Sequence, residues 1–407
     1  MDIVQQEVDQ LYKEHFGKMV ASLLYSSRDI DPETAEDIVQ DSFSSALADW
    51  RSKGIPSNSA GWIYKVCKHK ALNKLRKEKR TIGLSERENF ESVEIKFSES
   101  VLDDQQLKLL FACAHPDLSP KVQVVITLKY VVNLKVEAIS KILGMTIDGV
   151  DKLLLRARQR IKDEKILLEE PNTLALQPRL SIVHKILYLI FNEGYKSSWG
   201  KEILREELCE EALLMNKELL ESPLGNKETA ALHALMLFNS ARFKSRFGAS
   251  RELLDLEKQD RALWDRDLIM LACHFLNESR GQVISTYHLE ASIAYLHCTA
   301  KSFDSTDWNA ITNLYSRLLK DNPNPFVELN YAIALYYDGK EKHAFEILSA
   351  LKQHSFLSQY YLLNATLGKL HLLKRDGMLA KQYLQKAYDQ TNFIDEKNFI
   401  QKMIDEC

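Results

Sequence analysis

The segment from Leu134 to Lys162 restricts the possible folds of this chain more than any other. It reads LKVEAISKILGMTIDGVDKLLLRARQRIK: a short helical pattern, a turn at Gly144 and a second, basic helical pattern. A helix-turn-helix needs a small residue where its helices touch, a glycine at the turn and an apolar residue early in the second helix. Ser140, Gly144 and Val150 occupy those places, and Thr146 is a suitable N-cap. The pattern predicts a helix-turn-helix; the alternative is a helical hairpin with a solvated basic end.

A second basic helix is predicted upstream, from Ser59 to Arg80. An apolar stripe at helical spacing predicts its core side; the stripe consists of Ile63, Val66, Cys67, Ala71 and Leu75. The other faces carry Lys65, Lys68, Lys70, Lys74, Arg76, Lys77, Lys79 and Arg80 against Glu78 alone. Such clustering of positive charges favours a phosphate-binding surface over a solvated helix face, because a solvated face normally carries charges of both signs. Trp62 and Asn73 can stack on, or hydrogen-bond to, an exposed base.

The composition limits the remaining possibilities. A chain of 407 residues is expected to form two or three domains, and its net charge of −3 means that any nucleic-acid binding comes from local patches. Six cysteines without a CxxC pair are expected to be reduced, mostly buried thiols, with no metal site. The acidic N-terminal segment is unlike a signal peptide, and no apolar run reaches the roughly 20 residues of a membrane span, so we expect a cytoplasmic protein with no membrane association.

The helical patterns predict an all-α chain with four parts. Residues 1–80 form the first helical block, in which Asp31-Pro32 begins the second helix. Residues 81–104 lack a sustained period and are acidic, which predicts a flexible linker, and residues 105–168 contain the helix-turn-helix. This linker would either imitate nucleic acid or serve as a tether that its charge keeps off DNA. Residues 175–407 form a helical extension.

The C-terminal hundred residues suggest a repeat. The segments 324–351 and 359–388 each contain two helical patterns, with Gly339 and Gly377 between the helices and Ala344 and Ala380 following at similar offsets. The period is close to the 34 residues of tetratricopeptide-type helix pairs. The sequence therefore predicts stacked helical hairpins from about residue 310.

The two basic modules resemble the DNA-binding domains of bacterial extracytoplasmic-function sigma factors. Residues 35–50 (AEDIVQDSFSSALADW) resemble the polymerase-binding helix of that family, and residues 59–80 resemble its −10 recognition and strand-melting helix. The extension resembles the subgroup that has a long helical C-terminal region, in segments 107–120, 186–198, 257–269, 305–315 and 327–335. The resemblance spans almost the whole chain, and the order and spacing of the segments make it specific.

The resemblance implies core RNA polymerase and promoter DNA as partners. The polymerase β′ coiled coil would contact Asp37, Gln40, Asp41 and Phe43, and the β flap would contact the second domain. The loop Lys53–Gly61 would hold a flipped base of the −10 element, next to DNA contacts from Trp62, Lys65, Lys70, Asn73, Lys74, Arg76 and Lys77. The −35 element would meet Thr146, Asp148, Gly149, Lys152, Arg156, Arg158 and Arg160. Asp151 and Leu153 replace residues that are often basic in the family, so the −35 DNA sequence that this chain recognises cannot be inferred from its relatives.

The C-terminal half contains no recognisable catalytic pattern, and we expect neither enzymatic activity nor a cofactor. Its segment Phe191–Tyr195 suggests either a ligand loop or, preferably, a helix end with a glycine cap, and residues 259–265 suggest a buried polar network. We expect a regulatory domain that contacts its own N-terminal half or another protein. The alternative to a sigma factor is a polymerase-independent helix-turn-helix regulator with a protein-binding helical-repeat domain; an enzyme is the third, least supported possibility.

Overall fold

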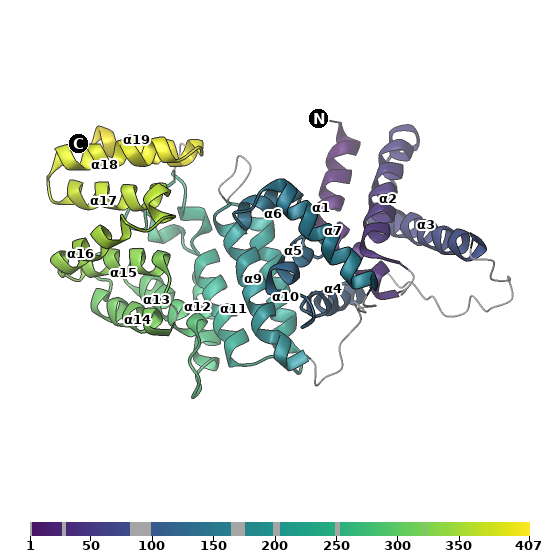
Figure 1. Cartoon of the computed structure of the whole chain (residues 1–407), viewed down its shortest axis with the longest axis horizontal. Coiled ribbons are helices and arrows are strands. Elements are labelled where there is room, and N and C mark those ends of the chain that lie inside the picture. Colours follow the sequence, from purple (N-terminus) through teal and green to yellow (C-terminus); the bar gives the residue numbers. More distant parts are fainter. Residues whose placement is uncertain are drawn as a thin grey trace. The chain divides into compact units, whose positions relative to one another are not determined.

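The computed structural model describes residues 2–26, 30–81, 99–163, 176–197, 204–248, 253–321 and 323–407. Within these ranges the regular secondary structure is helical (Figure 1). One isolated antiparallel bridge joins Phe247 to Leu253. The predicted all-α class is therefore confirmed. The chain divides into two compact units, Met1–Ile190 and Phe191–Cys407.

The first unit begins with three helices, α1 (Ile3–Ser26), α2 (Pro32–Lys53) and α3 (Ser59–Thr81). Asp31 caps α2 as predicted, because its side chain accepts a hydrogen bond of 2.9 Å from the Thr34 amide. Gly54 ends α2 with a φ of 82°, a conformation that glycine adopts without strain. The apolar stripes of these helices face inward, and that of α3 does so as predicted; Phe16, Val39 and Ile63 are among the buried side chains.

Four further helices follow in the first unit: α4 (Glu99–Cys113), α5 (Pro120–Tyr130), α6 (Val136–Ile142) and α7 (Ile147–Asp163). The start of α4 differs from the sequence prediction, because residues 99–104 of the predicted linker are helical; the rest of that linker, residues 82–98, lies outside the described residues. Helix α1 packs against both α2 and α4 and also reaches α5, so it joins the two helical blocks. The 3₁₀ helix η2 (Gln177–Arg179) and helix α9 (Leu180–Tyr195) follow.

The second unit starts with the end of α9 and continues with α10 (Glu206–Glu221), α11 (Lys227–Ser240), α12 (Arg266–Glu278) and α13 (Thr286–Thr299). Helix α11 is buried on nearly every face, since α10, α12 and α13 surround it. Among the described residues of this unit, short 3₁₀ helices lie at η3 (Phe243–Ser245), η4 (Arg261–Leu263) and η5 (Leu357–Gln359).

The last six helices are α14 (Trp308–Asp321), α15 (Pro325–Tyr337), α16 (Glu341–Leu351), α17 (Tyr361–Leu373), α18 (Gly377–Gln390) and α19 (Ile394–Asp405). Consecutive helices pack as hairpins, α15 with α16 and α17 with α18. The two hairpins correspond at other turn positions than predicted. The turn residues with positive φ are Gly339 (75°) and Arg375 (60°), whereas Gly377 is the first residue of α18. Ala344 and Ala380 both lie fully buried at the same offset after these turns.

Among the described residues, no helix has both the length and the apolar character required to cross a bilayer.

Candidate nucleic-acid interface

Helix α3 turns its apolar stripe inward and its cations outward. Ile63, Cys67, Ala71 and Leu75 are buried. The exposed candidate DNA contacts on this helix are Lys65, Asn73, Lys74, Arg76 and Lys77. The side chains of Glu78, Lys79 and Arg80 lie outside the described residues. The arrangement is suited to electrostatic attraction of a phosphate backbone.

Trp62 stands at the start of α3 and is half-buried. Its ring lies 5.5 Å from that of Trp50 in an edge-to-face contact. The preceding turn is held by a 2.8 Å hydrogen bond from the Gly61 amide to Asn58 Oδ1, and a Cβ at Gly61 would collide with the Asn58 side chain. Trp50 is buried at 2% exposure and supports the Trp62 ring, so the half-buried Trp62 is the aromatic side chain on which an unpaired base could stack.

Helix α2 presents an acidic, exposed face next to α3. Asp37, Gln40 and Asp41 are exposed on it. Phe43, which the resemblance placed at the polymerase contact, is instead buried at 3% exposure and packs edge-on against Tyr12 with ring centroids 5.0 Å apart. In this structure Phe43 therefore packs in the core under α2 and is not on the surface that a partner would contact.

The helix-turn-helix consists of α6 and α7. Gly144 has a φ of 59° at the turn, the Met145 amide donates to Ser140 O at 2.7 Å, and Ser140 and Val150 are buried. Thr146 caps α7 through a 3.1 Å hydrogen bond from the Gly149 amide to its hydroxyl. The predicted turn and cap are confirmed. Ile139 and Leu154 are buried, while Leu143 and Leu153 are half-buried.

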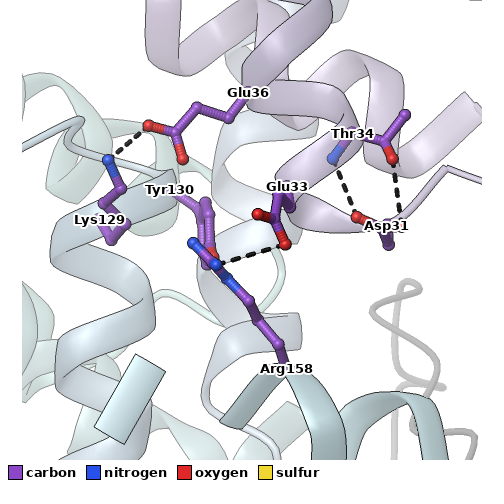
Figure 2. Close-up of polar contacts among 7 residues, drawn as sticks. All are labelled: Asp31, Glu33, Thr34, Glu36, Lys129, Tyr130 and Arg158. Carbon is purple, nitrogen blue, oxygen red and sulfur yellow. Dashed lines mark hydrogen bonds and ion pairs between the residues drawn. The ribbon is translucent and has the colours of Figure 1, made fainter. Parts of the chain in front are cut away.

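The polar candidates on α7 have different surroundings. Thr146, Asp148, Lys152, Arg156 and Arg160 are exposed, and Gly149 is half-buried. Asp148 and Lys152 form an exposed ion pair one turn apart, at 2.7 Å. Arg158 is drawn toward the protein: its Nε donates to the Tyr130 hydroxyl at 2.7 Å, and its guanidinium lies 3.4 Å from a Glu33 carboxylate oxygen (Figure 2).

The sequence prediction did not include three charged residues beside this site, Glu33, Glu36 and Lys129. Glu36 and Lys129 form an ion pair between α2 and α5, and both side chains are largely buried (Figure 2). Glu36 occupies a buried position of the α2 stripe, between Ala35 and Ile38. A charged residue within an apolar stripe was the one signal in the sequence that indicated a buried partner.

The polar network predicted for residues 259–265 is present in the second unit. Trp264 Nε1 donates to Ser245 Oγ at 2.8 Å, and Arg261 donates to the carbonyl oxygens of His297 and Ala300 at 2.7 and 2.9 Å. Asp260 accepts a hydrogen bond from the Ala262 amide. These bonds secure η4 and the start of α12 against the end of α13.

The segment Phe191–Tyr195 forms the end of α9, as the preferred interpretation held, but Gly194 is not a cap. A Cβ on Gly194 would lie 2.7 Å from Cys209 Sγ, so this glycine permits close approach of α10. The Tyr195 ring lies 3.8 Å below the Arg246 guanidinium, and its hydroxyl accepts a hydrogen bond of 2.9 Å from Arg242. These contacts give the segment a structural role.

A cavity of about 260 Å³ lies among the helical hairpins of the second unit. Its aromatic wall includes Trp308, Tyr315 and Tyr337, contributed by α14 and α15. At its edge Lys369 of α17 pairs with Asp255 at 2.6 Å and with Glu257 at 3.1 Å. The loop that carries these two acids therefore binds to the hairpin helices of its own unit.

All six cysteines are free thiols, and four of them are buried. Burial raises the pKa of Cys67, Cys113 and Cys209 to about 12, so these thiols stay protonated at neutral pH. No cluster of three or more potential metal ligands occurs among the residues that the structure describes.

Comparison with known proteins identifies the family. A sigma-70 region 2 model matches residues 12–81, a sigma-70 region 4 model matches residues 108–161, and a family of unknown function (DUF6596) matches residues 179–280. An uncharacterized protein of Rhizobium meliloti (strain 1021) is 30% identical over 396 residues, which cover 95% of this chain and 92% of that protein. No solved structure matches the chain.

The chain belongs to the sigma-70 family, whose members are transcription initiation factors and not enzymes. Within that family it is a sigma factor of the extracytoplasmic-function type with a helical C-terminal extension. It is a DNA-binding protein of the helix-turn-helix class, and RNA polymerase and promoter DNA are the partners of its family.

Proposed function

We propose that this sigma factor binds core RNA polymerase through α2, opens the −10 element with α3 and reads the −35 element with α7. The observation that carries the proposal is the juxtaposition of an acidic face on α2 and a cationic face on α3. One contact links the two faces: Lys70 Nζ lies 3.1 Å from the Asp41 carbonyl oxygen. A repressor that works without polymerase needs no such pair of adjacent, oppositely charged helices.

Strand opening on α3 needs no nucleotide hydrolysis. Unstacking a base costs a few kcal/mol. Stacking of that base on an aromatic side chain, worth roughly 1–3 kcal/mol per base, offsets this cost together with phosphate contacts. Trp62 and the turn at residues 53–61 would receive the flipped base, while Lys65, Asn73, Lys74, Arg76 and Lys77 would hold the adjoining backbone. Lys70 would join them by exchanging Asp41 for a phosphate.

Reading of the −35 element is assigned to α7. The N-terminal turn, with Thr146, Asp148 and Gly149, would approach base edges, because helix-turn-helix proteins direct that end of the second helix into the major groove. Lys152, Arg156 and Arg160 would neutralise phosphates. Arg158 would contribute only after leaving Tyr130 and Glu33.

The polymerase contact is assigned to the exposed residues Asp37, Gln40 and Asp41 of α2, facing basic residues of the β′ coiled coil, with the β flap binding the helix-turn-helix block. A variant with Asp37→Lys and Asp41→Lys should no longer co-elute with core polymerase. Asp49→Lys, which changes the same helix away from this face, is the matched control. Equal retention of both variants by polymerase contradicts the assignment.

We propose domain 2 at residues 1–80, a linker at 81–104 whose last six residues join α4, domain 4 at 105–168 and a regulatory extension at 175–407. A cytoplasmic location follows from the polymerase partner. The aromatic cavity and the stacked hairpins make the extension suitable for contact with a protein segment, from this chain or from another protein. Removal of residues 175–407 should change promoter-specific transcription in vitro; activity identical to that of the full chain would leave the extension only a stabilising role.

A further inference from the structure

A groove of about 760 Å³ lies between helices α12, α13 and α14 of the second unit. Each helix contributes a leucine to its lining, namely Leu276, Leu289 and Leu314. Ile284 and Tyr295 also line the groove and are 41% and 39% exposed. The groove shares none of its described lining residues with the aromatic cavity, so it is a separate site.

Exposed apolar side chains continue the lining beyond the groove. Met270 on α12 is 64% exposed, and Val283, in the loop between α12 and α13, is 81% exposed. Met270 occupies the same face of α12 as Cys273 and Asn277, and both of these residues line the groove. Single exposed apolar residues are ordinary, but a cluster of them beside a groove is typical of an interaction surface.

The groove is also positively charged. Arg280 and Arg317 line it and are exposed, and neither guanidinium forms an ion pair or a hydrogen bond with a residue that the structure describes. Lys227 adds a further cation nearby, because its Cγ would lie 3.6 Å from a Cβ on Gly281, which lines the groove. No aspartate or glutamate occurs among the described residues of the lining, and the exposed Glu278 lies outside it. The charge of the groove is therefore complementary to that of an acidic partner.

The loop that carries Arg280 is held in place by His288. The Ser285 amide donates to His288 Nδ1 at 3.1 Å, which leaves Nε2 as the donor to the Ser279 carbonyl oxygen at 3.0 Å. His288 thus links both ends of the loop to the start of α13. A groove whose walls are already ordered loses little conformational entropy when a partner binds.

We infer that this groove binds an acidic segment of another protein, whose apolar side chains fill it while its carboxylates pair with Arg280 and Arg317. The planar guanidinium group of arginine binds a carboxylate through two parallel hydrogen bonds. Exposed aliphatic side chains favour a protein over a nucleic acid, because protein–DNA interfaces are more polar and more strongly positive. The inference names the partner of the extension and rests on the proposed function only for the regulatory consequence of binding.

A random peptide library, displayed on phage and selected against the full chain, provides the probes. We expect the enriched peptides to combine several aspartates or glutamates with aromatic or aliphatic residues. In calorimetric titrations, Arg280→Glu/Arg317→Glu should weaken binding of these peptides by about a hundredfold, because like charges then face one another. Ile284→Ser should weaken it by about tenfold, since an apolar anchor is lost. Lys342→Glu/Lys381→Glu, the same change of charge at exposed positions outside the groove, should leave the affinity unchanged.

Cys273 reports where a peptide binds, because this half-exposed thiol lines the groove. Once Cys407 is replaced by serine, the other four cysteines are buried, so alkylation by iodoacetamide is confined to Cys273. We expect an enriched peptide to slow this alkylation severalfold. A selection that yields no acidic peptides, or acidic peptides that leave the alkylation rate of Cys273 unchanged, overturns the inference. Peptide binding that survives both Arg280→Glu/Arg317→Glu and Ile284→Ser overturns it as well.

Other occupants of the groove give different results. Alkylation that is slowed by single-stranded DNA and not by peptides would assign the groove to a nucleic acid and overturn the inference. Alkylation that slows as the protein concentration rises, without any peptide, would assign it to a second copy of the chain, with the same consequence. Circular dichroism checks that the variants fold, and Arg280→Gln/Arg317→Gln replaces a charge reversal that misfolds. Peptide binding that leaves promoter-specific transcription unchanged would support the inference and count against the regulatory role of the extension.

Discussion

Lys70 on α3 contacts Asp41 on α2, with its Nζ 3.1 Å from the carbonyl oxygen and 3.6 Å from a carboxylate oxygen of that residue. One side chain of the proposed DNA-binding surface is thus joined to the proposed polymerase-binding face. An exposed lysine nearby, Lys65, offers a direct comparison.

We predict that Lys65→Gln weakens binding of single-stranded −10 DNA. The plot of the logarithm of the binding constant against the logarithm of the salt concentration should become shallower by about 0.7, the value for one lost phosphate contact. Lys70→Gln should change this slope by a smaller amount, because Lys70 must first leave Asp41 to contact a phosphate. Titrations by fluorescence anisotropy over a range of salt concentrations measure both slopes. A larger slope change for Lys70→Gln than for Lys65→Gln contradicts the prediction.

The aromatic pair Trp50 and Trp62 suggests a second experiment. Trp62→Ala should slow open-complex formation and weaken −10 single-strand binding by about 1–3 kcal/mol, since a stacking surface is lost. Trp62→Phe retains a π-face and should lose much less. Permanganate reactivity of thymines reports on strand opening, and an equal loss in both variants would show that stacking is not the contribution of this residue.

The turn of the helix-turn-helix depends on the left-handed conformation of Gly144, whose φ is 59°. Gly144→Ala should destabilise the protein by about 1 kcal/mol and weaken binding of −35 duplex, because the turn sets the angle between α6 and α7. Gly144→Asn should cost less, since asparagine tolerates this region better than alanine does. Urea unfolding compares the two variants; equal stability of Gly144→Ala and the parent would refute the strain argument.

Acid should destabilise the second unit through His233. Burial, assisted by Lys217, lowers the pKa of His233 from 6.5 to about 4. The unfolded chain therefore takes up a proton more readily than the folded one, so this stabilisation is complete above about pH 6.5 and is lost as the pH falls toward 4. The imidazole also lies 3.3 Å from Asn216 Nδ2, a hydrogen bond that is possible only while Nδ1 is unprotonated.

The pH profile of urea unfolding measures this loss, which amounts to about 3 kcal/mol over that window. His233→Gln should reduce the loss of stability between pH 6.5 and 4, whereas His274→Gln, at an exposed position, should leave that loss unchanged. Identical profiles for the parent and His233→Gln would contradict the assignment.

The helices themselves could be predicted from the sequence because their signals are local. The apolar stripe of α3, the Asp31 cap and the Gly144 turn depend on residues within a few positions of one another, and the structure contains all three. The start of α4 at Glu99 could not be predicted, since its first turn is acidic and lacks an apolar period.

Contacts between distant segments were not predictable in the same way. Lys129 and Arg158 are charged residues on amphipathic helices, and sequence periodicity does not specify which carboxylates they meet. Phe43 was placed at a partner surface by resemblance, although its position in the α2 stripe is as apolar as that of Val39. Arg375 adopts a positive φ at a turn where the sequence analysis expected a glycine, because the amides of the turn before α18 donate hydrogen bonds to carbonyl oxygens of α17.

Open-complex formation with core RNA polymerase tests the central proposal most directly. Core polymerase and a supercoiled promoter library are incubated with the full chain or with Lys74→Glu/Arg76→Glu, and unpaired thymines are mapped with permanganate. We predict a single-stranded −10 bubble that requires the parent protein and polymerase together and is lost in the variant. A protein that never associates with polymerase, or a bubble that forms equally well with the variant, contradicts the account.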